Sequence, residues 1–171
     1  MKKMAYKDFT IKAIVTDFSR TESLLKDLAV LKGIDHQKDT YFNVSKGKLK
    51  LRQGTIENLI THYERIEDDG MEKTIVYQYD ANPTRNQIDS LFQNHKIIGT
   101  VEKIRRIYFS GIIKIHLDTL PDQRTFIEIE AIDSSDSIQS EELKAQCISM
   151  KRKLEISDEY LVKTGYLAAE S

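Results

Sequence analysis

The stretch Lys48-Leu49-Lys50-Leu51-Arg52 alternates cations with leucines at every step. Successive side chains of a β-strand point to opposite faces of its sheet, so a strand here has one ionic face and one apolar face. A period of two favours a strand over a helix, whose apolar residues recur every three or four positions. This stretch therefore predicts a sheet with one charged wall and one apolar wall.

Four other segments repeat the same design. In each of them charged or polar side chains take one set of alternate positions, and mostly apolar side chains take the other. The ionic sets are Asp8, Thr10 and Lys12; Lys103 and Arg105; Lys114, His116 and Asp118; and Glu128 and Glu130. Because both signs of charge occur, the predicted ionic wall mixes cations with carboxylates.

Eight segments have period two and many β-branched residues, and we predict them as strands. They are Tyr6–Val15, Asp39–Val44, Lys48–Gln53, Asn58–Arg65, Glu72–Tyr79, Lys96–Phe109, Ile112–Leu120 and Thr125–Ile132. Helices are predicted after Thr16 or Asp17 with an apolar face reaching Leu31, after Thr84, from about Ile138 to Leu154, and near Ser157. Strands joined mostly by short connections are typical of an antiparallel sheet or barrel with helices outside, so the predicted fold class is α+β.

The length and composition favour one domain, residues 1–171, because no Gly/Ser-rich linker divides the chain. The 26 basic and 27 acidic residues nearly cancel, which excludes a global basic field, and we expect no nucleic-acid partner. No segment approaches the ~20 apolar residues of a membrane span, so no membrane association is expected. Cys147 is the only cysteine, which fits a reducing compartment such as the cytoplasm. A homodimer is compatible with a domain of this size.

The ionic wall has two interpretations. An antiparallel sheet with one solvated face gives the same alternation and is its commoner cause. If the sheet instead closes with its apolar wall outward against the amphipathic helices, the ions line an interior. Such an interior needs ligands, because buried charges are costly unless they are paired. A phosphate chain with Mg²⁺ or Mn²⁺ meets both needs, since cations bind phosphate and carboxylates bind hard divalent ions.

Five segments together resemble the CYTH-domain proteins of the triphosphate tunnel metalloenzyme superfamily, nearest the class IV adenylate cyclase-like branch. They are Asp39–Phe42, Gly47–Arg52, Lys103–Arg106, Lys114–Asp118 and Phe126–Glu130. The resemblance implies an eight-stranded antiparallel β-tunnel, closed or nearly closed, with a charged interior. It also implies metal-dependent turnover of a triphosphate by cyclisation or hydrolysis, with ATP, thiamine triphosphate or tripolyphosphate as the small-molecule partner.

The resemblance further implies roles for individual residues. The implied triphosphate ligands are Lys12, Lys50, Arg52, Arg65, Lys103, Arg105 and Lys114. The implied ligands of Mg²⁺ or Mn²⁺ are Asp8, Asp118, Glu128 and Glu130. Lys12, Glu128 and Glu130 are the implied catalytic residues.

The first strand departs from the family's Glu-x-Glu-x-Lys pattern, because it reads Asp8-Phe9-Thr10-Ile11-Lys12. Losing the second carboxylate removes a strong oxygen ligand and should weaken metal binding. Two functions therefore stay open: an enzyme, and a nucleotide- or polyphosphate-binding module with a degenerate metal site. A sheet protein whose wet charged face binds a protein partner is the third hypothesis.

Overall fold

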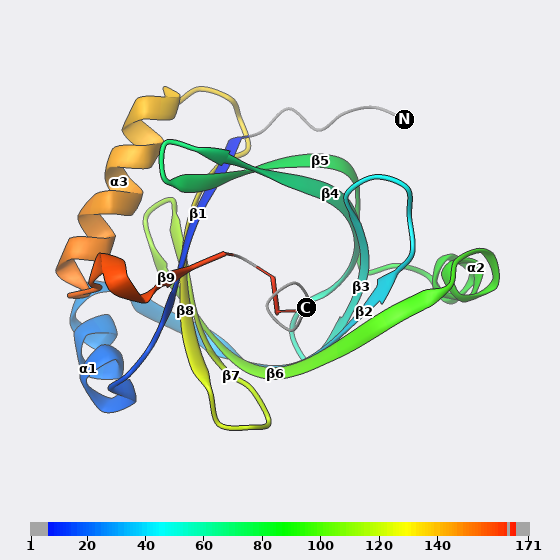
Figure 1. Cartoon of the computed structure of the whole chain (residues 1–171), viewed down its shortest axis with the longest axis horizontal. Helices are drawn as coiled ribbons and strands as arrows, with labels where there is room; N and C mark the ends of the chain where they lie inside the picture. Colours follow the sequence, from blue (N-terminus) through cyan, green and yellow to red (C-terminus); the bar gives the residue numbers. More distant parts are fainter. Residues whose placement is uncertain (1–6, 164, 167–171) are drawn as a thin grey trace.

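A computed structural model describes residues 7–163 and 165–166, so the predicted strand start at Tyr6 lies outside the described residues. Eight antiparallel strands form a closed barrel with three α-helices outside it (Figure 1). The strands are β1 (Lys7–Ile14), β2 (Val30–Phe42), β3 (Lys48–Gly54), β4 (Asn58–Asp68), β5 (Met71–Ala81), β6 (Ile97–Ser110), β7 (Ile113–Thr119) and β8 (Thr125–Asp133), followed by the two-residue β9 (Leu161–Val162). The helices are α1 (Phe18–Leu28), α2 (Arg85–Asn94), α3 (Ser140–Lys153) and the 3₁₀ turn η1 (Asp158–Tyr160).

The sheet closes because β1 has neighbours along both of its edges. The strand order is β5-β4-β3-β2-β6-β7-β8-β1, and β1 also pairs with β5 through Phe9 and Thr10. The short β9 pairs with the next part of β1, at Lys12 and Ala13. The interpretation of the ionic wall as the solvated face of an open sheet is therefore wrong.

The apolar wall faces the helices. Phe9, Ile115 and Ile129 of the barrel pack in one cluster with Leu25 of α1 and Leu143 of α3. A second cluster places Leu49 and Leu51 of β3 against Leu91 of α2. The leucines of the opening stretch thus face outward, which turns their neighbouring cations into the bore. No helix among the described residues is long and apolar enough to cross a membrane.

The first helix is shorter than predicted, and the strand after it is longer. Asp17 caps α1, as expected, by accepting a hydrogen bond from the Arg20 backbone N–H at 3.1 Å. The predicted extension of its apolar face to Leu31 is wrong, because β2 already begins at Val30 and pairs with β6 along its whole length. Charged and polar residues lie on both faces of this strand, so its first half shows no apolar period.

Candidate functional site

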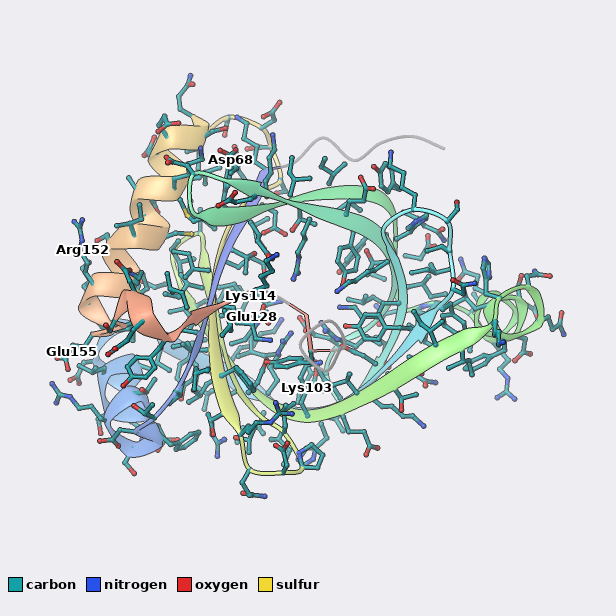
Figure 2. All side chains as sticks on the ribbon, in the orientation of Figure 1. Asp68, Lys103, Lys114, Glu128, Arg152 and Glu155 are labelled. Carbon is teal, nitrogen blue, oxygen red and sulfur yellow. The ribbon has the colours of Figure 1, made fainter. Side chains whose placement is uncertain are left out.

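The barrel encloses a cavity of about 350 Å³, and the ions predicted from the sequence converge on it. Figure 2 shows Lys103, Lys114 and Glu128 pointing into the bore from β6, β7 and β8. The ionic residues of the cavity wall include Asp8, Lys50, Arg52, Arg65, Lys103, Arg105, Lys114, Glu128 and Glu130. Two of the residues predicted as phosphate or metal ligands, Lys12 and Asp118, do not line the cavity.

Asp39 of β2 gathers three of the cations. The Arg52 guanidinium donates to both of its carboxylate oxygens at 2.9 and 2.8 Å, and the Lys103 ammonium donates at 2.7 Å. The Lys50 ammonium lies 3.9 Å away. Burial alone would raise the pKa of Asp39, but the three cations hold it well below its ordinary value. The sequence did not reveal this role, because the polar neighbours of Asp39 in β2 hide the alternation.

Asp118, a predicted metal ligand, is bound by protein groups on two sides. Arg105 donates to its two oxygens at 2.7 and 2.8 Å, and the Tyr166 hydroxyl donates at 2.5 Å. The Arg105 guanidinium also lies 3.8 Å from Glu128. Charge-assisted bidentate pairs of this kind fix geometry strongly. Asp118 thus orients Arg105 toward the bore, and its role as a metal ligand stays a prediction.

Lys12 is almost fully buried, and its ammonium has no hydrogen-bond partner within the described part of the chain. The nitrogen lies 3.3 Å from the centre of the Tyr166 ring and 4.7 Å from that of Phe126. Burial lowers the pKa of this ammonium to about 8. Tyr166 belongs to the cavity wall and covers both Lys12 and Asp118 at this end of the bore. No periodicity or motif in the C-terminal sequence marked Tyr166 as part of the site.

Three further carboxylates lie in the cavity wall: Asp8 and Glu130 form a pair, and Glu128 lies apart from them. Asp8 and Glu130 lie on neighbouring strands, and burial together with the Glu130 charge raises the pKa of Asp8 well above its ordinary value. Thr10, which stands where the family pattern has its second Glu, donates a hydrogen bond from its hydroxyl to Asp8 at 3.3 Å. Glu128 stands apart, 3.9 Å from the imidazole of His116. A divalent ion would relieve the repulsion of the Asp8–Glu130 pair and suits its hard oxygens. The described residues nonetheless contain no group of three His, Cys, Asp or Glu side chains placed to hold a metal.

Residues 9–166 match the CYTH domain family. The chain belongs to this family. No curated protein sequence matches it.

Solved structures similar to this CYTH domain cover almost the whole chain. The PH1012 protein of Pyrococcus horikoshii is 24% identical with a TM-score of 0.79, over 94% of this chain and 98% of that one. A candidate adenylate cyclase of Vibrio parahaemolyticus is 16% identical with a TM-score of 0.75, over 94% and 95% of the two chains. HpAC1 of Hippeastrum, a candidate adenylyl cyclase with a dominant triphosphatase activity, is 16% identical with a TM-score of 0.65, over 95% and 94%. At these identities the likeness shows the fold.

Glu57 and Arg65 of this CYTH domain also line the cavity. Glu57, in the turn between β3 and β4, accepts a hydrogen bond from the Lys114 ammonium at 2.6 Å, and the neighbouring Lys114 and Arg52 charges lower its pKa to about 2 despite its burial. Arg65 donates from Nε to Thr74 at 3.3 Å, and its guanidinium lies 5.2 Å from the centre of the Tyr63 ring. The family resemblance implied Arg65, and nothing in the sequence indicated Glu57, because a residue in a turn belongs to no alternation.

Proposed function

We propose that this CYTH domain binds a triphosphate compound together with Mg²⁺ or Mn²⁺ inside its bore and turns it over, by hydrolysis or by cyclisation of a nucleotide. The observation that carries the proposal is the gathering of cations from four strands around one cavity, with a pair of buried carboxylates among them. Buried charges of like sign are costly unless an opposite charge compensates them, and a bound anionic ligand would do so for these cations. The membership of the CYTH family supports the same conclusion.

The balance of charge in the bore supports a metal-bound form of the ligand. Asp39 already neutralises part of the charge of three cations, Asp118 binds Arg105, and Glu57 binds Lys114. A bare triphosphate would therefore enter a site with little free positive charge. One bound together with a divalent ion carries less charge and fits better.

Each residue then has a proposed role. The phosphate oxygens would bind to Lys50, Arg52, Arg65, Lys103 and Arg105, with Lys12 and Lys114 at the two ends of the bore. Asp8 and Glu130 would hold the ion as a pair, and Glu128, which stands apart from them in this structure, would have to turn toward it. When bound, the ion would neutralise charge on the phosphoryl group under attack. Asp39 and Asp118 act as positioning residues, because they fix the side chains of Arg52 and Arg105.

The test is an assay of phosphate and cyclic AMP release from ATP and of phosphate release from tripolyphosphate, with Mg²⁺ or Mn²⁺. Glu128→Ala and Glu130→Ala should each lower metal-dependent turnover by more than about 100-fold, the range seen when groups that stabilise transition-state charge are removed. Lys50→Ala should mainly raise KM. Glu102→Ala, on the exposed outer face of β6, is the matched control and should leave the rates unchanged. Unchanged kinetics in both glutamate variants would refute the proposed mechanism.

A second candidate function is binding without turnover. Two features favour it. Thr10 replaces the second Glu of the family pattern, and Tyr166 covers Lys12 and donates a hydrogen bond to Asp118. A binding module would retain tripolyphosphate or ATP tightly in the presence of a metal chelator and release no product. Calorimetry beside the phosphate assay distinguishes the two functions.

The proposed setting is the cytoplasm, with the chain acting as one domain. Cys147 is a buried free thiol, and burial raises its pKa to about 12, so it stays protonated and unreactive. A lone unoxidised cysteine fits a reducing compartment.

A further inference from the structure

Glu57 projects from the turn that joins β3 to β4 onto two cations of the bore. Its carboxylate accepts from Lys114 of β7 at 2.6 Å and lies 3.8 Å from the Arg52 guanidinium. The Gln37 side-chain amide also donates to it, at 3.3 Å. The carboxylate of Glu57 thus takes a place beside cations that a phosphate group could take.

The turn that carries Glu57 is fixed by Asp35, which is fully buried in β2. Asp35 accepts hydrogen bonds from the backbone N–H groups of Ile56 and Glu57 at 2.8 and 2.9 Å, and from the Thr55 hydroxyl at 3.0 Å. Three hydrogen bonds to a single carboxylate make the turn rigid. Glu57 is therefore held over Lys114 by the fold and does not depend on that one contact.

The Glu57–Lys114 pair lies at the open end of the bore. Its side chains are 16% and 17% exposed, against 1% for Lys103 and 4% for Arg105. The other end holds Tyr166, which is buried. A phosphate chain that enters therefore passes Glu57 and comes to rest on the deeper cations. Next to Glu57 the wall continues with Leu59 and Tyr79, which offer apolar surface in place of charge.

From this geometry we propose that Glu57 ends the phosphate-binding stretch of the bore and limits the ligand to three phosphates. The inference rests on the proposed function and adds a determinant of chain length to it. Glu57 neutralises much of the charge of Lys114, so that Lys114 binds only the outermost of three phosphates, and it repels a fourth phosphate at close range. The outer end of the ligand then meets Leu59 and Tyr79, which offer no charge to a fourth phosphate.

The test is calorimetry of inorganic tripolyphosphate and tetrapolyphosphate binding, in a buffer with chelator so that no turnover occurs, and again with Mg²⁺. In the unaltered protein tetrapolyphosphate should bind no tighter than tripolyphosphate, despite its larger charge. Glu57→Gln keeps the size of the side chain, and its one amide oxygen can still accept from Lys114, but the variant loses the negative charge and the acceptor for Gln37. It should bind tetrapolyphosphate at least about tenfold tighter than the unaltered protein does, and tripolyphosphate less than about threefold tighter.

Two further variants separate this role from a general change of charge or stability. Glu102→Gln removes one charge from the outer face of β6 and should leave both affinities unchanged. Glu57→Asp retains the charge and should retain the discrimination. An equal gain for both polyphosphates, or no gain, in a Glu57→Gln protein with an unchanged melting temperature would overturn the inference alone. If the unaltered protein bound neither compound, with or without Mg²⁺, the proposed function would fail and this inference with it.

Discussion

At the scale of single residues, the bore depends on carboxylates that hold its cations in place. Asp39 is the clearest case, because its side chain is almost fully buried and touches cations from two other strands. Removing one member of a buried ionic network leaves the others without compensation. The three cations beside Asp39 are among those that would bind phosphate.

Asp39→Asn should lower the free energy of unfolding by about 3–5 kcal/mol, the range for breaking a buried ion pair. Chemical denaturation measures this loss. Tripolyphosphate should restore part of the stability, since a ligand that binds only the folded state stabilises it. The rise in melting temperature with tripolyphosphate should therefore be larger in the variant than in the unaltered protein. An equal or smaller rise would contradict the role of Asp39 in neutralising these three cations.

The buried Lys103 ammonium should make the affinity for tripolyphosphate depend on pH. Burial, followed by the charge of Arg52, lowers the pKa of its ammonium from 10.5 to about 8. Because phosphate binds the charged form, the free protein must take up a proton to bind above pH 8. Affinity for tripolyphosphate should fall between pH 7 and pH 9, by up to about tenfold per pH unit above 8 for one such lysine. Calorimetry at several pH values, with Lys103→Arg as the variant that keeps its charge and has a shallower slope, checks this.

At the scale of elements, the closing seam between β1 and β5 is the weakest part of the barrel. Two residue pairs join these strands, whereas β1 and β8 are joined from Lys7 to Ile14. The hairpin of β4 and β5 has a second attachment, because the Lys144 ammonium of α3 donates to Asp68 at 2.7 Å. Figure 2 shows Asp68 beside α3, at the tip of this hairpin.

Lys144→Met should therefore loosen the seam while keeping most of the length of the buried side chain. We expect a loss of about 1 kcal/mol, since Asp68 is 37% exposed and solvent screens the pair. Hydrogen exchange should become faster at the amides of β5 and of Phe9 and Thr10, with those of β6 and β7 unchanged. Uniform protection across the barrel would mean that the pair does not secure the seam.

The alternation in β3, β7 and β8 predicted their inner and outer faces correctly, because each has an apolar set of residues that packs against a helix or a strand. The first half of β2 carried no such signal, since its partner β6 and the buried Asp35 determine its conformation. Glu57 and Tyr166 could not be predicted as parts of the site for a related reason. Each is placed by contacts between segments far apart in the chain.

At the scale of the whole molecule, the barrel has one open end and one end at which Tyr166 covers Lys12. The C-terminal segment reaches this position through β9, which pairs with the part of β1 that β5 leaves free. The ring of Tyr166 packs edge-on against Phe126, with 5.2 Å between their centres. Access to Lys12 therefore depends on this segment.

Tyr166→Ala should open the second end and expose Lys12 to amine reagents. Since the pKa of Lys12 is about 8, much of it is the reactive neutral amine at pH 8. Labelling of Lys12, followed by mass spectrometry, should increase at least about tenfold over that in the unaltered protein. Tyr166→Phe keeps the ring and should leave labelling low, and the exposed Lys26 serves as the internal reference. Similar labelling of Lys12 in the alanine and unaltered proteins would show that the ring does not cover it.

The most direct test of the account is the change in melting temperature that tripolyphosphate and Mg²⁺ cause, measured on the unaltered protein and on a Lys50→Met, Arg105→Met double variant. These two cations reach the cavity from β3 and β6. The account predicts a rise of several degrees in the unaltered protein that grows with ligand concentration, and little or no rise in a folded double variant. An unaltered protein whose melting temperature does not respond to any triphosphate, or a double variant that responds equally, would contradict it.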